Sequence, residues 1–198
     1  TTFLSIAPKA AAFAILLRIL LVALGTFKPL WVVLLVAVSI LSMTYANIVA
    51  IAQRNIKRLL AYSGIAQVGN VFIGLAAGTK MGNDAILFYL LAYLFANIGA
   101  FAVVIAVSQA IGTDEIEDYR GLSRRSPFLA FAMLLFLLSL AGVPPLAGFI
   151  GKLYIFVAAI KEGLYTLIVV GLINIVISMY YYLIVVKQMY INEPIDPS

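Results

Sequence analysis

Long apolar runs alternate with short polar connectors along this chain. The runs cover residues 3–24, 30–52, 59–78, 85–111, 128–160 and 164–186, and the connectors are 25–29, 53–58, 79–84, 112–127 and 161–163. Each run is close to or above the roughly 20 residues that a helix needs to cross a bilayer. A backbone exposed to lipid must satisfy its own hydrogen bonds, and these runs are too long for barrel strands. The pattern therefore predicts an all-α, polytopic transmembrane bundle of about six helices.

The fifth run, 128–160, is too long for one regular helix and contains a predicted break. Its middle reads GVPPLAG, with Pro144 and Pro145 between Gly142 and Gly148. The prolines remove two backbone donors and clash with the preceding turn, and the glycines add backbone freedom. Interrupted helices at membrane depth leave unpaired backbone groups and often mark transport sites. The alternative is a kink that serves packing alone.

Two lysines are the candidates for proton relay. Lys152 follows the break, among apolar neighbours, and Lys9 precedes small residues in the first run. Burial in an apolar interior disfavours the ammonium form, so a lysine held there can gain and lose a proton. Each could instead be an anchor, with Lys152 extending to one membrane surface and Lys9 flanking its segment. Arg18 stays charged at any accessible pH and suits a fixed counter-charge or an anchor.

Polar side chains recur at helical spacing on four of the predicted helices. They form four stripes: Ser39, Ser42 and Asn47; Ser63, Gln67 and Asn70; Tyr89, Tyr93 and Asn97; and Asn174, Ser178 and Tyr182. Stripes of this kind share one helix face, and aligned hydroxyls and amides could hold a file of water between the lysines. The predicted supports of such a path are Ser63, Gln67, Asn70, Tyr93, Asn97, Asn174 and Ser178. The alternative for each is an interhelical hydrogen bond, which contributes about 0.6 kcal/mol on average.

Composition excludes several other classes of protein. Hydrophobic residues make up 65% of the 198 residues and charged residues 11%, whereas about a quarter of a soluble domain is charged. The net charge of +5 comes from basic residues dispersed between apolar runs, so no nucleic-acid partner is expected. Cysteine and histidine are absent, which excludes disulfides, Cys-ligated iron–sulfur clusters and His-ligated haem in this chain. All eight acids fall in connectors, segment edges or the tail, so no carboxylate pairs with either lysine inside the membrane.

Basic residues divide unequally between alternate connectors, which predicts the orientation. With the N-terminus inside, the inner side holds Arg54, Lys57, Arg58, Arg120, Arg124, Arg125 and Lys187, and the outer side holds Lys28, Lys80 and Lys161. The positive-inside rule then places both ends of the chain on the negative side of the membrane, which is cytoplasm, matrix or stroma. The first residues carry no charged region with a cleavage site, so no signal peptide is expected.

Four motifs resemble a known family of membrane subunits. They are NIKRLLAYS at 55–63, YRGL at 119–122, LSLAGVPPLAGFIGKLY at 138–154 and SMYYYL at 178–183. Together they closely resemble the antiporter-like subunit N (subunit 2) of NADH–quinone oxidoreductase, which is respiratory complex I, and of its photosynthetic relatives. The resemblance covers nearly the whole chain.

The resemblance implies an inverted-repeat fold of about fourteen helices, in which each five-helix repeat contains one broken helix. This chain matches the eighth to thirteenth helices. Residues 1–29 would be the last helix of the first half with its connector, 30–186 the second repeat with broken helix 128–160, and 187–198 a polar C-terminal tail. Lys9 resembles the central-channel lysine, and Lys152 the lysine that exchanges protons with the positive side. The family's glutamate and its other lysine have no counterpart here, and Gln67 stands where related subunits often have histidine.

The leading hypothesis is a proton-translocating subunit of a complex I-type NAD(P)H–quinone oxidoreductase. FMN, iron–sulfur clusters and quinone would then lie in partner subunits, with no cofactor in this chain. The expected partners are other membrane subunits, especially neighbouring antiporter-like ones, and the lipid bilayer. The membrane would be a bacterial plasma membrane, a thylakoid or an inner mitochondrial membrane. The alternatives are a subunit of a multisubunit cation/proton antiporter and a scaffold without a transport role.

Overall fold

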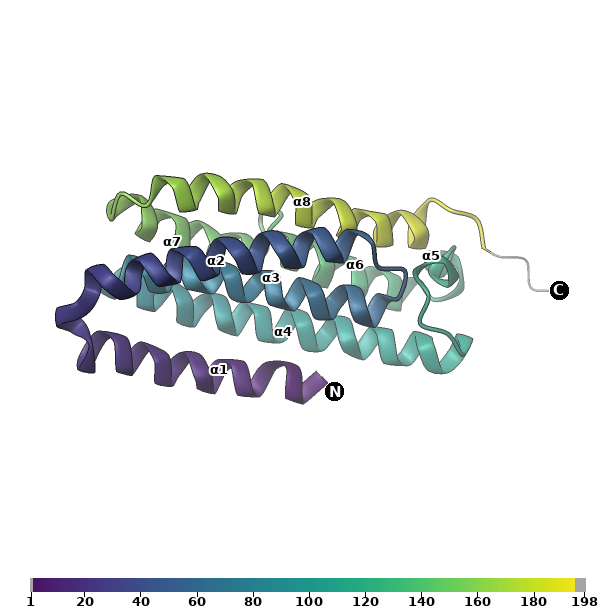
Figure 1. Ribbon diagram of the computed structural model, residues 1–198. Helices are drawn as coiled ribbons and strands as arrows, with labels where there is room; N and C mark the ends of the chain where they lie inside the picture. Colours follow the sequence, from purple (N-terminus) through teal and green to yellow (C-terminus); the bar gives the residue numbers. More distant parts are fainter. Residues whose placement is uncertain (1, 195–198) are drawn as a thin grey trace.

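Helices account for almost all of the chain. The structure is a computed structural model that describes residues 2–194, and for residues 2–7, 9, 10 and 21 it describes only the backbone. The main helices are α1 (Thr2–Arg18), α2 (Lys28–Ile51), α3 (Ile56–Ala77), α4 (Lys80–Ile111), α6 (Pro127–Ala141), α7 (Ala147–Lys161) and α8 (Tyr165–Tyr190). Short elements join them: the π-helical turn η1 (Ile19–Ala23), the 3-10 turns η2 (Gly25–Phe27) and η3 (Ile116–Tyr119), and the four-residue helix α5 (Leu122–Arg125). Figure 1 shows the long helices side by side in one bundle.

The six predicted segments are confirmed, including the interruption of the fifth. Helices α3, α4 and α8, together with the segment Gly25–Ile51, are long and apolar enough to cross a membrane. The run predicted at 128–160 is divided into α6 and α7, with residues 142–146 between them. The first segment is also less regular than hydropathy suggests, because its last turn, Ile19–Ala23, is π-helical.

The connectors gather alternately at the two ends of the bundle. At one end, Lys28 at the start of α2 forms an ion pair of 3.1 Å with Glu162 after α7. At the other end, the N–H of Ile56 donates to the carbonyl of Asp114 at 2.9 Å. We call this second end the basic end, defined by Arg54, Lys57, Arg58, Arg120, Arg124, Arg125 and Lys187. The start of α1 and the end of α8 lie toward it, as does α5 (Figure 1).

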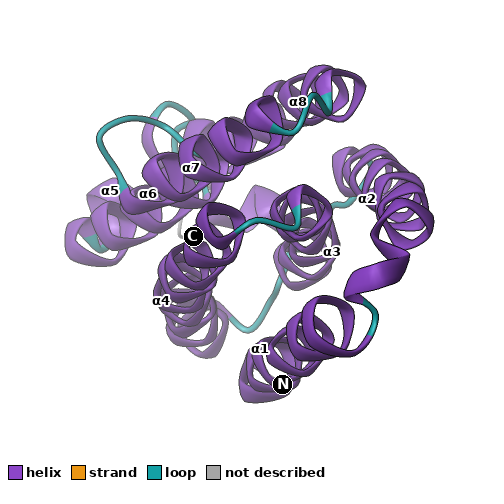
Figure 2. Cartoon of the chain, turned by 90° about the vertical axis from the view of Figure 1, so that its left-hand side faces the viewer, coloured by secondary structure: helices purple, strands orange, loops and turns teal. Residues whose placement is uncertain are grey.

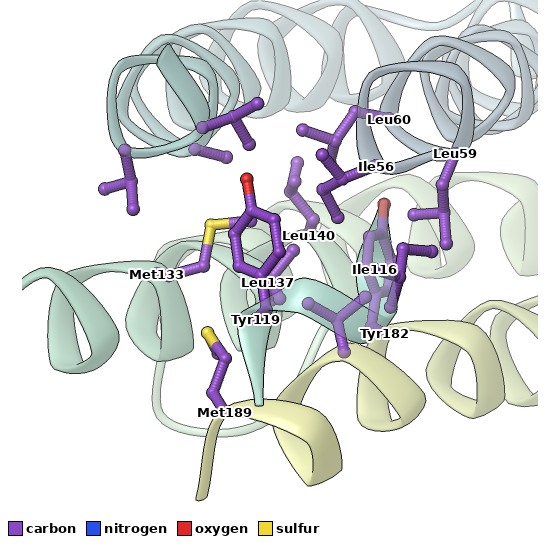
Figure 3. Packing of buried hydrophobic residues seen from close by; sticks show 14 of the residues in the cluster. Ile56, Leu59, Leu60, Ile116, Tyr119, Met133, Leu137, Leu140, Tyr182 and Met189 are labelled. Carbon is purple, nitrogen blue, oxygen red and sulfur yellow. The ribbon is translucent and has the colours of Figure 1, made fainter. Parts of the chain in front are cut away.

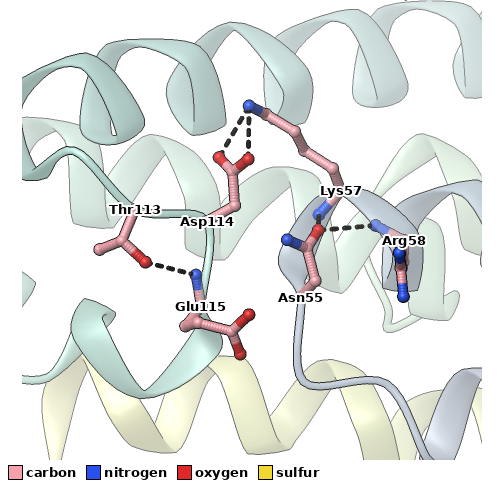
Figure 4. Close-up of polar contacts among 6 residues, drawn as sticks. All are labelled: Asn55, Lys57, Arg58, Thr113, Asp114 and Glu115. Atoms are coloured by element: carbon pink, nitrogen blue, oxygen red, sulfur yellow. Dashed lines mark hydrogen bonds and ion pairs between the residues drawn. The ribbon is translucent and has the colours of Figure 1, made fainter.

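A polar clasp at the basic end joins the start of α3 to the α4–η3 connector (Figure 4). Asn55 caps α3, and its side-chain oxygen accepts from the N–H groups of Lys57 at 3.0 Å and Arg58 at 3.2 Å. These amides have no partner within the helix, so the cap fixes where α3 begins. The Lys57 ammonium then bridges to Asp114, at 2.7 Å from one carboxylate oxygen and 2.8 Å from the other.

Helix α3 lies at the centre of the bundle, with α2, α4 and α7 around it (Figure 2). Most of its residues are buried. Close approach of α2 depends on Gly69, because a Cβ there would lie 2.3 Å from the Met43 side chain and 3.2 Å from the Ser39 carbonyl oxygen. Small residues at such contacts let transmembrane backbones pack closely. Polar side chains on α3 are therefore held inside the protein, away from lipid.

Apolar side chains from four elements pack together beside the break, toward the basic end (Figure 3). They include Ile56, Leu59 and Leu60 of α3, Ile116 and Tyr119 of η3, Met133, Leu137 and Leu140 of α6, and Tyr182 and Met189 of α8. Tyr119 and Tyr182 are fully buried in this cluster. This packing holds α6 against α3 and α8, and so determines where the end of α6 lies along the bundle.

Candidate functional site at the helix break

Helix α6 ends in a turn closed by Gly142. This residue has a φ of +87°, in the left-handed region that favours glycine. Its N–H donates to the Ser139 carbonyl at 3.1 Å, and the N–H of Val143 donates to the Leu138 carbonyl at 3.0 Å. This pair of bonds is the Schellman pattern of helix termination. The carbonyl groups of Leu138 and Ser139 are thereby satisfied.

The next two carbonyls of α6, those of Leu140 and Ala141, lose their usual donors to proline. In a continuing helix each carbonyl accepts from the N–H four residues later. Those residues are Pro144 and Pro145, and neither has an N–H. The break therefore leaves two adjacent carbonyl oxygens at a helix C-terminus, where the helix dipole is negative.

Lys152 supplies the missing donors. Its ammonium donates to the carbonyl oxygen of Leu140 at 2.8 Å and to that of Ala141 at 3.0 Å. The residue is 3% exposed, so the ammonium points into the break and does not extend to a membrane surface. Carbonyl groups at the C-terminus of α6 thus provide the negative potential that a carboxylate provides elsewhere.

Overlap of the two half-helices brings Lys152 to this position. The first turn of α7 passes alongside the last turns of α6, and the Gly148 N–H donates to the Ser139 hydroxyl at 3.3 Å. A Cβ on Gly148 would lie 1.8 Å from the Ser139 carbonyl oxygen, so only glycine fits here. Lys152, one turn further along α7, reaches back to the end of α6. Among the predicted break residues, Gly142, Pro144, Pro145 and Gly148 therefore each have a distinct structural part.

Gln67 of α3 meets the same site from the other side. It is 2% exposed, and its amide nitrogen donates to the Leu140 carbonyl oxygen at 2.9 Å. Its amide oxygen accepts from the Asn70 amide at 3.1 Å and from the Tyr89 hydroxyl. Gln67 also lies 3.4 Å from the Tyr182 hydroxyl. The predicted residues Gln67 and Lys152 therefore meet at the Leu140 carbonyl, and Asn70 joins them through Gln67.

Other predicted residues are held by their own helices or by a second cluster. The Ser63 hydroxyl donates to Leu60 at 2.8 Å and the Ser178 hydroxyl to Ile175 at 2.7 Å, both to backbone carbonyls one turn earlier. Asn174 accepts from the Asn47 amide at 2.9 Å. Tyr181 donates to the same Asn47 at 3.0 Å, and its ring lies 4.6 Å from that of Tyr182. This Asn47–Asn174 cluster joins α2 to α8.

Tyr93 and Asn97 lie on the α4 side of the break. Tyr93 borders a narrow gap together with Tyr89, Ser139 and Gly148, and the gap does not admit a water molecule. Asn97 is buried, and its amide oxygen accepts no hydrogen bond from any described residue. Tyr93 therefore faces the break at Ser139 and Gly148.

Lys9 lies in α1, but its side chain is outside the part of the chain whose side chains are described. Four residues further on, the Phe13 ring contacts the Phe72 ring at 5.3 Å, which packs α1 on α3. The ion pairs among described residues all lie at the two ends: Lys28–Glu162, Lys57–Asp114 and Arg120–Glu117.

Sequence reasoning missed the acceptors of Lys152, because they are backbone atoms. A signal was present, since counting four residues back from each proline identifies the carbonyls of Leu140 and Ala141. It also missed Tyr181 and Thr44, whose hydroxyls bond Asn47 and Asn174. No periodicity argument pairs α2 with α8.

This chain is similar to known proteins both in sequence and in structure. NAD(P)H-quinone oxidoreductase subunit 2 of Microcystis aeruginosa is 50% identical over 196 residues, which is 99% of this chain and 38% of that protein. A chain of respiratory complex I from Thermus thermophilus aligns at 40% identity with a TM-score of 0.71, over 83% of this chain and 38% of that one. A chain of the Mrp complex from Dietzia sp. aligns at 26% identity with a TM-score of 0.85, over 94% of this chain and 34% of that one.

These matches confirm the resemblance found in the motifs. The chain spans less than two-fifths of the length of the subunit 2 relatives. The sequence profile described as "NADH:quinone oxidoreductase/Mrp antiporter, TM" matches residues 1–178. This chain is an integral membrane protein that belongs to the NADH:quinone oxidoreductase/Mrp antiporter family.

Proposed function

We propose that this chain is part of a proton-translocating subunit of a complex I-type NAD(P)H–quinone oxidoreductase, and that Lys152 carries protons within it. The observation that supports this most directly is the buried Lys152 ammonium on the carbonyls of Leu140 and Ala141. Helix dipoles stabilise a cation less than a full carboxylate charge does. The proton on Lys152 therefore remains transferable, whereas an ion pair would hold it.

Gln67 senses the charge of Lys152 through the carbonyl that they share. When Lys152 loses its proton, its attraction for the Leu140 oxygen weakens and Gln67 becomes the stronger donor there. The oxygen of the same amide accepts from Tyr89 of α4. A charge change at Lys152 therefore alters the hydrogen bond between Gln67 and Tyr89. Gln67 cannot take up a proton at neutral pH, so it acts as a positioning residue.

We propose that water reaches Lys152 from the α4 side, after the side chains around the break move. The gap between Tyr89, Tyr93, Ser139 and Gly148 is too narrow for water in the present arrangement. A shift of Tyr89 or Tyr93 widens it and connects Lys152 to the polar face of α4. The next polar group proposed for the path is Asn97, whose buried amide oxygen accepts no hydrogen bond from a described residue.

Electron transfer belongs to partner subunits in this proposal. The chain has no cysteine or histidine to ligate an iron–sulfur cluster or haem, and FMN, the clusters and quinone are assigned to the partners. Those partners include other membrane subunits of the assembly, with antiporter-like neighbours beside this one. The basic end faces the negative side of the membrane, in accord with the positive-inside rule.

A second candidate is a subunit of a multisubunit cation/proton antiporter. The Mrp complex chain from Dietzia sp. supports it, with a TM-score of 0.85 over 94% of this chain. The identity is 26% in that comparison, against 40% for the complex I chain and 50% for the subunit 2 relative. Sequence is the better guide to the assembly, because the fold is common to both. Copurified flavin and iron–sulfur subunits support the first candidate, and copurified small hydrophobic antiporter subunits support the second.

The decisive experiment replaces Lys152 in the whole complex and measures proton uptake in proteoliposomes. Lys152→Ala should abolish most quinone-coupled proton pumping while the complex still assembles. Lys152→Arg keeps a cation but releases no proton, so it should also be inactive. Lys161→Ala, at the exposed end of α7, is the matched control and should pump normally. Unchanged pumping by Lys152→Ala in an intact complex removes Lys152 from the mechanism.

A further inference from the structure

A groove outside the Lys152 site runs along the start of α4 and reaches Tyr154 in the middle of α7. It is open on one side and has a volume of about 440 Å³, within the range of small-molecule sites. Its lining residues are Lys80, Met81, Asp84, Ala85, Phe88 and Tyr154. None of them belongs to the hydrogen-bonded network around the break.

Polarity changes with depth along this groove. Lys80 is the first residue of α4, at the end of the bundle opposite the basic end. Phe88 lies eight residues further, about 12 Å along the helix axis. The Phe88 and Tyr154 rings meet edge to face at 6.2 Å and close the deep part of the groove. The groove is thus charged at the membrane surface and apolar at the depth of the hydrocarbon.

The two charged residues present complementary groups on one helix face. Lys80 and Asp84 are spaced four residues apart and are both exposed, and neither forms an ion pair or hydrogen bond with a described residue through its side chain. Lys80 offers only donors, and the Asp84 carboxylate only acceptors. A ligand that satisfies both must carry an anionic group and a hydrogen-bond donor a few ångströms apart.

We propose that this groove binds one phospholipid whose headgroup carries a hydrogen-bond donor. The lipid phosphate binds Lys80, the headgroup amine or hydroxyl donates to Asp84, and an acyl chain lies over Phe88 and Tyr154. Phosphatidylethanolamine and phosphatidylglycerol meet these requirements. Phosphatidylcholine does not, because its quaternary ammonium has no N–H to donate.

The surroundings favour a lipid over a helix of another subunit. The groove opens onto apolar side chains that are already suited to acyl chains, with Leu87 59% exposed, Leu91 56% exposed and Leu153 46% exposed. A transmembrane helix would have to bring its own anion and its own donor to the membrane surface at this point. A phospholipid headgroup already carries an anionic phosphate and a hydrogen-bond donor, and both are attached directly to apolar acyl chains.

Photo-crosslinking in the assembled complex tests the proposal. Phe88→p-benzoylphenylalanine places a crosslinker at the deep end of the groove. Membranes contain equal parts of phosphatidylcholine, phosphatidylethanolamine and phosphatidylglycerol, and mass spectrometry identifies the adducts. We expect the two donor lipids to exceed phosphatidylcholine by about tenfold, the preference that one hydrogen bond to a charged group provides. Val176→p-benzoylphenylalanine is the control, because Val176 is 67% exposed on α8, away from the groove, and should report the bulk composition.

Two variants separate the roles of the charges. In the same crosslinking background, Asp84→Asn should remove most of the preference between headgroups. Lys80→Gln should lower the total lipid adduct without changing the ratio of headgroups, since all three lipids carry the phosphate. An adduct at Phe88 that matches the bulk composition would show ordinary annular lipid and overturn the proposal. A crosslink to another protein chain would overturn it as well.

Discussion

Lys152 and Gln67 donate to the same acceptor, the carbonyl oxygen of Leu140, at 2.8 Å and 2.9 Å. One residue comes from α7 and the other from α3, so the end of α6 is fixed from both sides. The arrangement explains how a buried ammonium is held without a carboxylate, because carbonyls freed by proline take its place. It also makes Gln67 the residue through which the charge of Lys152 reaches the rest of the bundle.

Gln67→Leu should destabilise the protein by about 1–3 kcal/mol. The substitution removes the Gln67 oxygen that accepts from Tyr89 and Asn70 and leaves these buried polar groups with one acceptor fewer. Reversible unfolding in mixed micelles measures the change. Ser178→Ala on α8 is the comparison, because its hydroxyl donates to the Ile175 carbonyl of its own helix. Equal losses for the two variants would contradict the central place given to Gln67.

Gly148→Ala should disturb both stability and the Lys152 site. The new methyl group would lie 1.8 Å from the Ser139 carbonyl oxygen, and a backbone oxygen cannot rotate away. The start of α7 must therefore move, at a cost of about 1–3 kcal/mol, and Lys152 moves with it. Proton pumping and unfolding are both measured.

The control for this prediction is Gly25→Ala. A Cβ at Gly25 meets nothing within 4 Å, so the same substitution there should be nearly neutral. Normal pumping by Gly148→Ala would mean that the distance between α6 and α7 does not determine the position of Lys152.

Much of this architecture follows from the sequence, because hydropathy alone decides which segments enter a membrane. The break between α6 and α7 was predictable from Pro144 and Pro145, and so in principle were the carbonyls that these prolines release. The link from Leu140 to Gln67 was not predictable, since it depends on the packing of α3 against α6 across 73 residues of sequence. The π-helical turn at Ile19–Ala23 was missed for a related reason, because helical turns of either kind have the same apolar composition.

The Asn47–Asn174 pair should show measurable coupling between α2 and α8. The Asn47 amide donates to both the side-chain oxygen and the backbone carbonyl of Asn174, at 2.9 Å and 3.1 Å. Hydrogen bonds between transmembrane helices are worth about 0.6 kcal/mol on average and up to about 1.7 kcal/mol. A double-mutant cycle of Asn47→Ala and Asn174→Ala in unfolding experiments should give a coupling energy in this range.

Pumping by the same variants decides whether Asn174 also supports the proton path. A strong loss of pumping in Asn174→Ala, at unchanged stability, would place it on the path. A coupling energy near zero would mean that the contact between α2 and α8 rests on apolar packing alone.

The clasp between Lys57 and Asp114 should weaken in acid. Hydrogen bonds from Lys57 and Ser108 hold the pKa of Asp114 below its usual range, so the folded state binds the proton less readily than the unfolded state. The stabilisation is therefore complete above the ordinary carboxyl pKa of about 3.9 and is lost as the pH falls through the lowered value. Both side chains are partly exposed, so the contribution is at most about 1 kcal/mol.

Amide hydrogen exchange at Ile56 and Ile116 reports on this clasp, because their N–H groups bond across the two connectors at 2.9 Å and 2.8 Å. Asp114→Asn should lower their protection at neutral pH, and the difference from the wild type should vanish in strong acid, where Asp114 is protonated. Glu115→Gln, at the exposed neighbouring residue, should leave the protection unchanged at either pH. A difference for Asp114→Asn that persists undiminished in acid would mean that the carboxylate charge does not hold the connectors together.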